Sequence, residues 1–200
     1  MKKRNLFWFC PFIIMGLLFL TDGCKDDDDD KDEETVNYFK VGGEYSEISH
    51  GALISFGTDD YYEGYNFDLY LVSAGISDGG DDGPTGSGVM IYFELFTSSS
   101  TSLASGEYNY DDESDIFPVG TFDYADYCLD WSDENEDNSF IEFASGKVNV
   151  SKVGNEYILN ISGKDEFGNT ITGYYKGLLT QYDGSKKSAK VKTRGLQARI

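Results

Sequence analysis

The chain has 200 residues and a formal net charge of −20, with 16% aromatic residues within a hydrophobic share of 40%. So acidic a surface would repel phosphate, which excludes nucleic acid as a partner and favours cations or neutral ligands. The aromatic content excludes a disordered chain, and three cysteines are too few for a disulfide framework. We therefore expect one folded domain that is stabilised by its own core.

The first 23 residues have the composition of an export signal. Lys2, Lys3 and Arg4 precede an apolar run over residues 6–20. This run is shorter than the roughly 20 residues that a membrane-spanning helix needs, so we expect residues 1–23 to be a lipoprotein signal peptide. The open alternative is an uncleaved membrane anchor.

Cys24 is the expected site of lipid attachment. Gly23 precedes it, and lipoprotein signal peptidase requires a small residue before the cysteine that becomes acylated. Thr21 and Asp22 depart from the usual motif, which has leucine three residues before the cysteine. The sequence thus predicts a membrane partner that is reached through lipid on Cys24.

Residues 24–35 are expected to be an acidic tether. Eight acidic residues and two lysines occupy residues 25–34, and their mutual repulsion favours an extended chain. In position and composition this run resembles the export signal of surface lipoproteins of the Bacteroidota. The resemblance implies a protein that is lipid-anchored in the outer membrane and exposed at the cell surface. A spacer on the periplasmic side is the alternative.

Residues 36–183 are expected to form one all-β domain. Apolar and polar residues alternate with the period of two that is typical of strands with one buried face. The alternation is clearest over residues 66–73, and over residues 89–96 it indicates a strand that is covered on both faces. Eight or nine strands are expected, over residues 36–40, 52–56, 66–73 and 89–96, around Phe122 and residues 127–131, and over residues 140–143, 147–153, 157–162 and 170–182.

Turn residues predict an antiparallel arrangement with a C-terminal meander. Gly154-Asn155 and residues 165–169 have the composition of hairpin connections. Gly173 and Gly177 allow the last run to bend, as a barrel requires. The expected fold is a lipocalin-like β-barrel or a β-sandwich.

Several segments resemble a group of Bacteroidota lipoproteins that have small β-barrel or β-sandwich domains. They are residues 38–41, residues 64–71, Leu103 with Gly106 and Tyr108, and Gly168 to Gly177, which reads GNTITGYYKG. The resemblance implies the same fold class and location. It brings no catalytic residues to this chain.

One acidic loop is a candidate calcium site. Asp133, Asn135 and Asp137 place side-chain oxygens at alternate positions, as a calcium loop does. Asn138 stands at the usual glycine position and Ala144 at that of the bidentate glutamate, which excludes an EF-hand. The alternative is an acidic loop that keeps the protein soluble. No other cofactor is expected.

Aromatic residues suggest a binding surface for a glycan or a protein. The candidates are Tyr61, Tyr62 and Tyr65 in one loop, with Trp131 further along the chain. Aromatic rings stack on sugars, but they are also favoured in strands and at sheet rims, where they cover the core. The sequence allows both interpretations, a ligand-binding surface and aromatic residues that cover the core.

Enzymatic signals are weak, and we expect no catalytic residues. His50 is the only histidine, and the acidic neighbours of Cys128 would disfavour a thiolate, so a buried structural thiol is expected there. Among 27 acidic residues between Thr35 and Asp183, some pair will lie at glycosidase spacing by chance.

Residues 184–200 are expected to be a basic tail without a regular fold. The tail contains six cationic residues and no acidic residue. It either docks on the acidic body, binds anionic lipopolysaccharide or has no partner. The whole pattern favours a non-enzymatic binding module at the cell surface. A structural or adhesive component of a surface assembly is the alternative, followed by a glycoside-acting enzyme.

Overall fold

Twelve strands form the folded part of the chain, which the computed structural model describes over residues 36–78 and 83–184. The first six strands are β1 (Tyr38–Val41), β2 (Glu44–Glu47), β3 (His50–Gly57), β4 (Tyr65–Val72), β5 (Ile76–Ser77) and β6 (Thr85–Thr97). The other six are β7 (Gly106–Tyr110), β8 (Thr121–Ser132), β9 (Ile141–Val153), β10 (Glu156–Asp165), β11 (Thr170–Gly177) and β12 (Leu179–Asp183).

The predicted signal peptide, Cys24, the acidic tether and the tail from Ser185 onward lie outside the described residues. Within residues 36–78 and 83–184, no helix has the length and apolar character needed to cross a membrane.

The expectation of an all-β domain is confirmed, but the predicted number of eight or nine strands is wrong. Strands β2, β5 and β7 are short and contain few apolar residues, so they leave almost no alternation to detect. The predicted run 170–182 is divided at Leu178 into β11 and β12, whereas runs 140–143 and 147–153 belong to the single strand β9.

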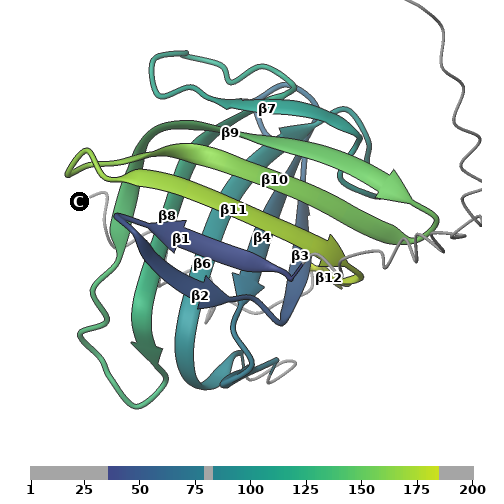
Figure 1. Ribbon diagram of the computed structural model, residues 1–200. Coiled ribbons are helices and arrows are strands. Elements are labelled where there is room, and N and C mark those ends of the chain that lie inside the picture. Colours follow the sequence, from purple (N-terminus) through teal and green to yellow (C-terminus); the bar gives the residue numbers. More distant parts are fainter. Residues whose placement is uncertain (1–35, 79–82, 185–200) are drawn as a thin grey trace, which may run out of the picture. The chain divides into compact units, whose positions relative to one another are not determined.

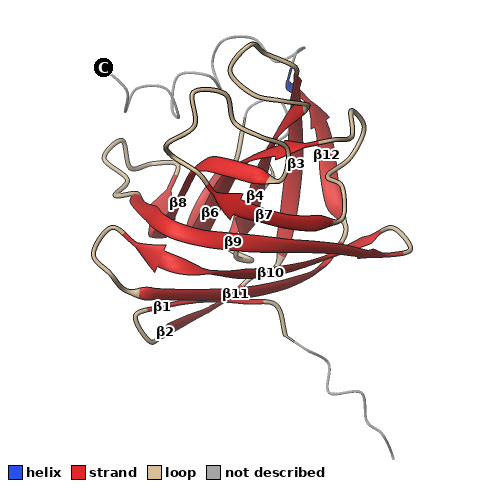
Figure 2. Ribbon diagram, turned by 90° about the horizontal axis from the view of Figure 1, so that it is seen from above, coloured by secondary structure: helices blue, strands red, loops and turns tan. Residues whose placement is uncertain are grey.

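The strands lie side by side in one curled sheet that forms a half-barrel (Figures 1 and 2). Their order is β12-β3-β4-β6-β8-β7-β9-β10-β11-β1-β2, with β5 paired to β6. The C-terminal meander is confirmed, because β9, β10 and β11 pair antiparallel in sequence order. A two-residue turn at Gly154-Asn155 joins β9 to β10, and Gly154 has the positive φ of 62° that such a turn requires.

Purely antiparallel pairing was a wrong expectation, because two strand pairs are parallel. β12 pairs parallel with β3, and β7 pairs parallel with β8. The partners in each pair are not joined by a hairpin, so no turn signal in the sequence specifies their direction. The sheet is therefore mixed.

The chain passes from β11, near one end of the strand order, to β12 at the other end. β11 pairs with β10 and β1, the chain passes through Leu178, and β12 then pairs with β3. The Tyr175 hydroxyl donates a hydrogen bond of 2.7 Å to the Leu178 carbonyl at this break. A Cβ at Gly177 would lie 2.8 Å from that hydroxyl oxygen, so glycine leaves the space that this bond needs.

The inside of the curled sheet is filled by side chains. Phe67, Leu69 and Leu71 of β4 face inward, as the alternation over residues 66–73 predicts, and each is at most 2% exposed. The same cluster contains Ile91, Phe93 and Leu95 of β6. A smaller cluster of Val72, Ile76, Met90, Cys128 and Trp131 covers part of β6 on its other face. The prediction that Cys128 is buried is confirmed.

Asp165 fastens the turn between β10 and β11 to the core. It is 1% exposed, and its Oδ2 accepts a 2.8 Å hydrogen bond from the Tyr127 hydroxyl. The backbone N–H groups of Phe167 and Asn169 and the Asn169 side chain donate to the same carboxylate. Burial raises the pKa of Asp165, but these hydrogen bonds outweigh burial and lower it.

We predict that Asp165→Ala destabilises the fold by about 3 kcal/mol, because it leaves the Tyr127 hydroxyl and two turn N–H groups without their acceptor. Urea unfolding monitored by circular dichroism measures this cost. Asp60→Ala, which removes an exposed carboxylate, is the control and is expected to change stability by less than about 0.5 kcal/mol. Equal stabilities of the two variants would contradict the role given to Asp165.

Candidate functional site

The four predicted ligand-binding aromatics do not come together. Trp131 is 4% exposed and belongs to the small core cluster, while Tyr61 is 72% exposed. Tyr62 stacks on Phe96 at 4.8 Å between ring centroids, and Tyr65 packs against the main core. Tyr65 and Trp131 lie at opposite ends of β6, where they pair with Thr97 and Gly88. Of these four, only Tyr61 presents most of its surface to solvent.

The predicted calcium loop is held by hydrogen bonds within the loop. Asn135 Oδ1 accepts the Asp137 N–H at 3.1 Å, and the Asn138 side chain donates to the Ser132 and Asn135 carbonyls. Asp133 and Asp137 are exposed. In the part of the chain that the structure describes, no three His, Cys, Asp or Glu side chains are grouped to hold a metal ion. Calcium binding by this loop stays a prediction.

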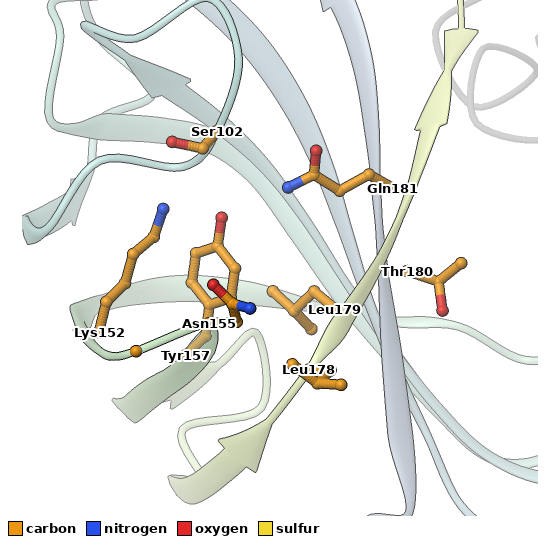
Figure 3. Close-up of a pocket in the computed structure, with 9 residues that line it drawn as sticks. Ser102, Lys152, Asn155, Tyr157, Leu178, Leu179, Thr180 and Gln181 are labelled. Carbon is orange, nitrogen blue, oxygen red and sulfur yellow. The ribbon is translucent and has the colours of Figure 1, made fainter.

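An open groove of about 520 Å³ lies between β12 and the hairpin of β9 and β10. Its volume is within the range of ligand-binding pockets in proteins. In Figure 3, Lys152 and Tyr157 rise from the hairpin side and Gln181 extends toward them from β12, while Thr180 points away. The groove is lined by Ser102, Lys152, Gly154, Asn155, Tyr157, Leu178, Leu179, Thr180 and Gln181.

Tyr157 forms the floor of this groove and has an unusual hydroxyl. The residue is 4% exposed, and its Oη has no hydrogen-bond partner among the described residues. Lys152 Nζ lies 4.4 Å from the centroid of the Tyr157 ring, so the lysine covers one face of the ring. The groove is therefore lined by polar groups of Tyr157, Lys152, Asn155 and Gln181. Because Lys152 covers the Tyr157 ring, that face of the ring is not open to a ligand.

A second hollow of about 440 Å³ adjoins the groove along β12. Gln181 belongs to both linings and separates the two spaces. Ser100 and Ser102, from the loop between β6 and β7, contribute one side chain to each hollow. β12 and this loop thus line both hollows.

A second concentration of polar groups lies on the outer face of β4, β6 and β8. We call it the acid–tyrosine face, and it consists of Asp68, Tyr70, Tyr92, Glu94, Tyr124 and Asp126. The register pairs Asp68 with Glu94 and Glu94 with Tyr124, and it pairs Tyr70 with Tyr92 and Tyr92 with Asp126. The Tyr124 hydroxyl donates to Asp126 Oδ2 at 2.9 Å.

Two carboxyl groups of the acid–tyrosine face, those of Asp68 and Asp126, hold their protons more tightly than usual. Burial raises the pKa of Asp68 well above its ordinary value, and the charge of Glu94 raises it further. Burial also raises the pKa of Asp126 to about 7, with a smaller contribution from Glu142, although the bond from Tyr124 lowers it. Ionising these groups costs free energy, because the charged form is withdrawn from water beside other acids.

Sequence reasoning missed both regions. The alternation of Asn66, Asp68 and Tyr70 with apolar residues assigns them to one face of a strand. Their neighbours Glu94 and Asp126 come from strands whose register the sequence does not give. The groove depends on β12 lying beside β3, which no local signal specifies.

Comparison of the chain with protein-family models, curated proteins and solved structures finds no match.

We predict that Asp126→Asn stabilises the protein at pH 8 and that the gain shrinks by more than half at pH 5. The pKa of the Asp126 carboxyl is near 3.9 in the unfolded chain and about 7 in the folded one. The stability that the folded protein gains by keeping this carboxyl protonated is therefore fully present below about pH 4 and is lost as the pH rises through about 7. A shift of this size corresponds to about 4 kcal/mol at pH 8. Tyr92, Tyr124 and Glu142 face this carboxyl.

Urea unfolding at the two pH values measures the effect of this substitution. Asp60→Asn, at an exposed position in a loop, makes the same chemical change without burial and is expected to leave stability nearly unchanged at both values. A stability difference for Asp126→Asn that is the same at pH 5 and pH 8 would contradict the raised pKa.

Proposed function

We propose that this protein is a non-enzymatic binding module, lipid-anchored through Cys24 in the outer membrane and exposed at the cell surface, that binds a neutral glycan in the groove beside β12. Recognition is passive, because the ligand exchanges hydrogen bonds with side chains that the sheet holds in place. The acidic segment after Cys24 supports surface export, and the groove supports ligand binding.

The observation that carries the proposal is the buried Tyr157 hydroxyl at the groove floor, which has no hydrogen-bond partner among the described residues. A buried polar group without a partner costs about 1–3 kcal/mol, and a ligand hydroxyl that reaches it would recover this free energy. Asn155 and Gln181 add amide donors and acceptors, which suit the many hydroxyl groups of a sugar.

The charge of the protein favours a neutral ligand over an anionic one. Lys152 supplies a cation within the groove, but the whole chain has a net charge of −20. That charge repels anions at long range, and it does not oppose the approach of a neutral oligosaccharide. Lys152 then acts as a donor to sugar oxygens.

The filled interior also favours a polar surface ligand over a small apolar one. Leu53, Leu69 and Ile91 are fully buried inside the half-barrel, where an apolar ligand would need an open cavity. The strands at the two ends of the strand order, β2 and β12, have only four and five residues, and β2 contains Glu44 and Glu47. Short or charged edges disfavour the strand-to-strand stacking that an adhesive assembly would use.

We predict that Tyr157→Phe lowers glycan affinity about tenfold, because one hydrogen bond of roughly 1.4 kcal/mol is lost. A glycan array probed with the mature chain carrying Cys24→Ser, which removes the lipid, identifies the sugar, and calorimetry then measures the affinities. Since the hydroxyl lacks a partner in the free protein, the variant is expected to be at least as stable as the parent.

Thr170→Ala is the matched control for the groove, because Thr170 is exposed on β11 and does not line the groove. Its glycan affinity is expected to equal that of the parent, whereas Gln181→Ala is expected to weaken binding. The glycan proposal would be contradicted if the parent bound no glycan on the array, or if the Tyr157→Phe protein bound the glycan as tightly as the parent.

We predict that the mature N-terminus is an acylated Cys24 and that Cys24→Ser releases the protein from the membrane fraction. Mass spectrometry of the purified native protein identifies the terminal residue and its acyl groups. Protease treatment of intact cells separates surface exposure from a periplasmic location. An unmodified Cys24 would remove the lipid anchor from the proposal and leave the glycan groove untouched.

A further inference from the structure

The acid–tyrosine face lies on strands that have no cations of their own. β3, β4, β6 and β8 contain no lysine or arginine. Within residues 36–78 and 83–184, the one ion pair joins Lys147 to Glu107, on β9 and β7. Any cation that neutralises Asp68 therefore comes from outside these four strands.

One carboxylate oxygen of this face is buried without a donor. Asp126 is 8% exposed, and its Oδ2 accepts the Tyr124 hydroxyl. Its Oδ1 has no hydrogen-bond partner among the described residues. Buried carboxylate oxygens are normally bonded, so this atom indicates a donor group that the described strands do not supply.

The chain leaves β12 toward the same face. A Cβ at Gly184 would lie 2.7 Å from Phe56 Cε1 and 2.9 Å from Ile54 Cγ2, so the backbone at Gly184 lies directly on these β3 side chains. Ile54 pairs with Asp68 across β3 and β4, and paired residues share one face of a sheet. Residue 184 is thus one strand, about 5 Å, away from the acid–tyrosine face.

The segment that starts there is strongly basic. Residues 185–200 contain no acidic residue, and their cations are Lys186, Lys187, Lys190, Lys192, Arg194 and Arg199. Lys190, Lys192 and Arg194 stand at alternate positions, so an extended chain would present all three on one side. Sixteen extended residues reach about 50 Å, which is ample to cross three strands.

We propose that residues 185–200 dock on the acid–tyrosine face of their own chain. The cations pair with Asp68 and Glu94, and the lysine and arginine stems lie over the rings of the three tyrosines, where cations bind favourably. Tyr70 and Tyr92 are 5.0 Å apart, and Tyr92 and Tyr124 are 5.9 Å apart, so the rings form a continuous aromatic strip. This docking also holds β12 against β3, since β12 leads directly into the segment.

Tryptic cleavage of the tail in the mature Cys24→Ser chain tests the docking. The tail is expected to be cut at least about tenfold faster in the Asp68→Asn/Glu94→Gln variant, because its counter-charges are gone. Raising the salt from 0.05 to 0.5 M is expected to accelerate cleavage of the parent in the same way, since it screens the ion pairs. Intact-mass spectrometry measures each rate.

Glu134→Gln/Asp137→Asn is the matched control, because it removes the same charge from an exposed loop and is expected to leave the cleavage rate unchanged. Equal cleavage rates in the parent and in both double variants would overturn the proposal. Protection that grows with protein concentration would also overturn it, because the tail would then dock on a second copy.

A variant of the tail alone guards against misfolding of the double variant. The variant Lys190→Gln/Lys192→Gln/Arg194→Gln changes no residue of the twelve strands, so it tests the docking without altering the sequence of the fold. NMR amide shifts are expected to change at Asp68, Glu94 and Asp126 and to stay constant in β9 and β10. Unchanged shifts at the acid–tyrosine face would overturn the proposal whatever the cleavage rates.

Discussion

The parallel pairing of β12 with β3 is the contact on which the rest of the architecture depends. It brings the end of the C-terminal meander to the strand that begins the β3-β4-β6-β8 half of the sheet. Gly51 makes the approach possible, because a Cβ there would lie 2.6 Å from the Leu179 side chain. The break at Leu178, capped by the Tyr175 hydroxyl, lets one continuous segment serve both halves of the sheet.

The groove follows from that pairing. β12 forms one wall of the groove because it stands opposite the hairpin of β9 and β10. At its end the chain turns onto the outer face of β3, beside Asp68. One strand of five residues therefore forms a wall of the groove and ends beside the β3 side chains that adjoin Asp68.

Charge is divided unevenly between the two halves of the sheet. The lysines of the described strands lie on β1, β9, β10 and β11, whereas β4, β6 and β8 contain none and include the buried acids Asp68 and Asp126. Buried carboxylates such as Asp68 and Asp126 destabilise a fold when they ionise without a counter-charge. Their retention on one face fits a surface that is built to receive cations.

The sequence by itself determined the class of the fold and the local elements that depend on neighbouring residues. Alternation placed Phe67, Leu69 and Leu71 inside, and turn residues predicted the hairpin at Gly154-Asn155 and the meander. Only the tertiary structure decided which distant strands pair, because register and parallel direction arise from contacts between residues far apart in the chain. Trp131 shows the difference, since its aromatic ring suggested a binding surface and packing made it part of the core. Tyr157 shows the converse. Its sequence context is that of an ordinary strand residue, but in the fold it lines a groove because β12 lies across from it.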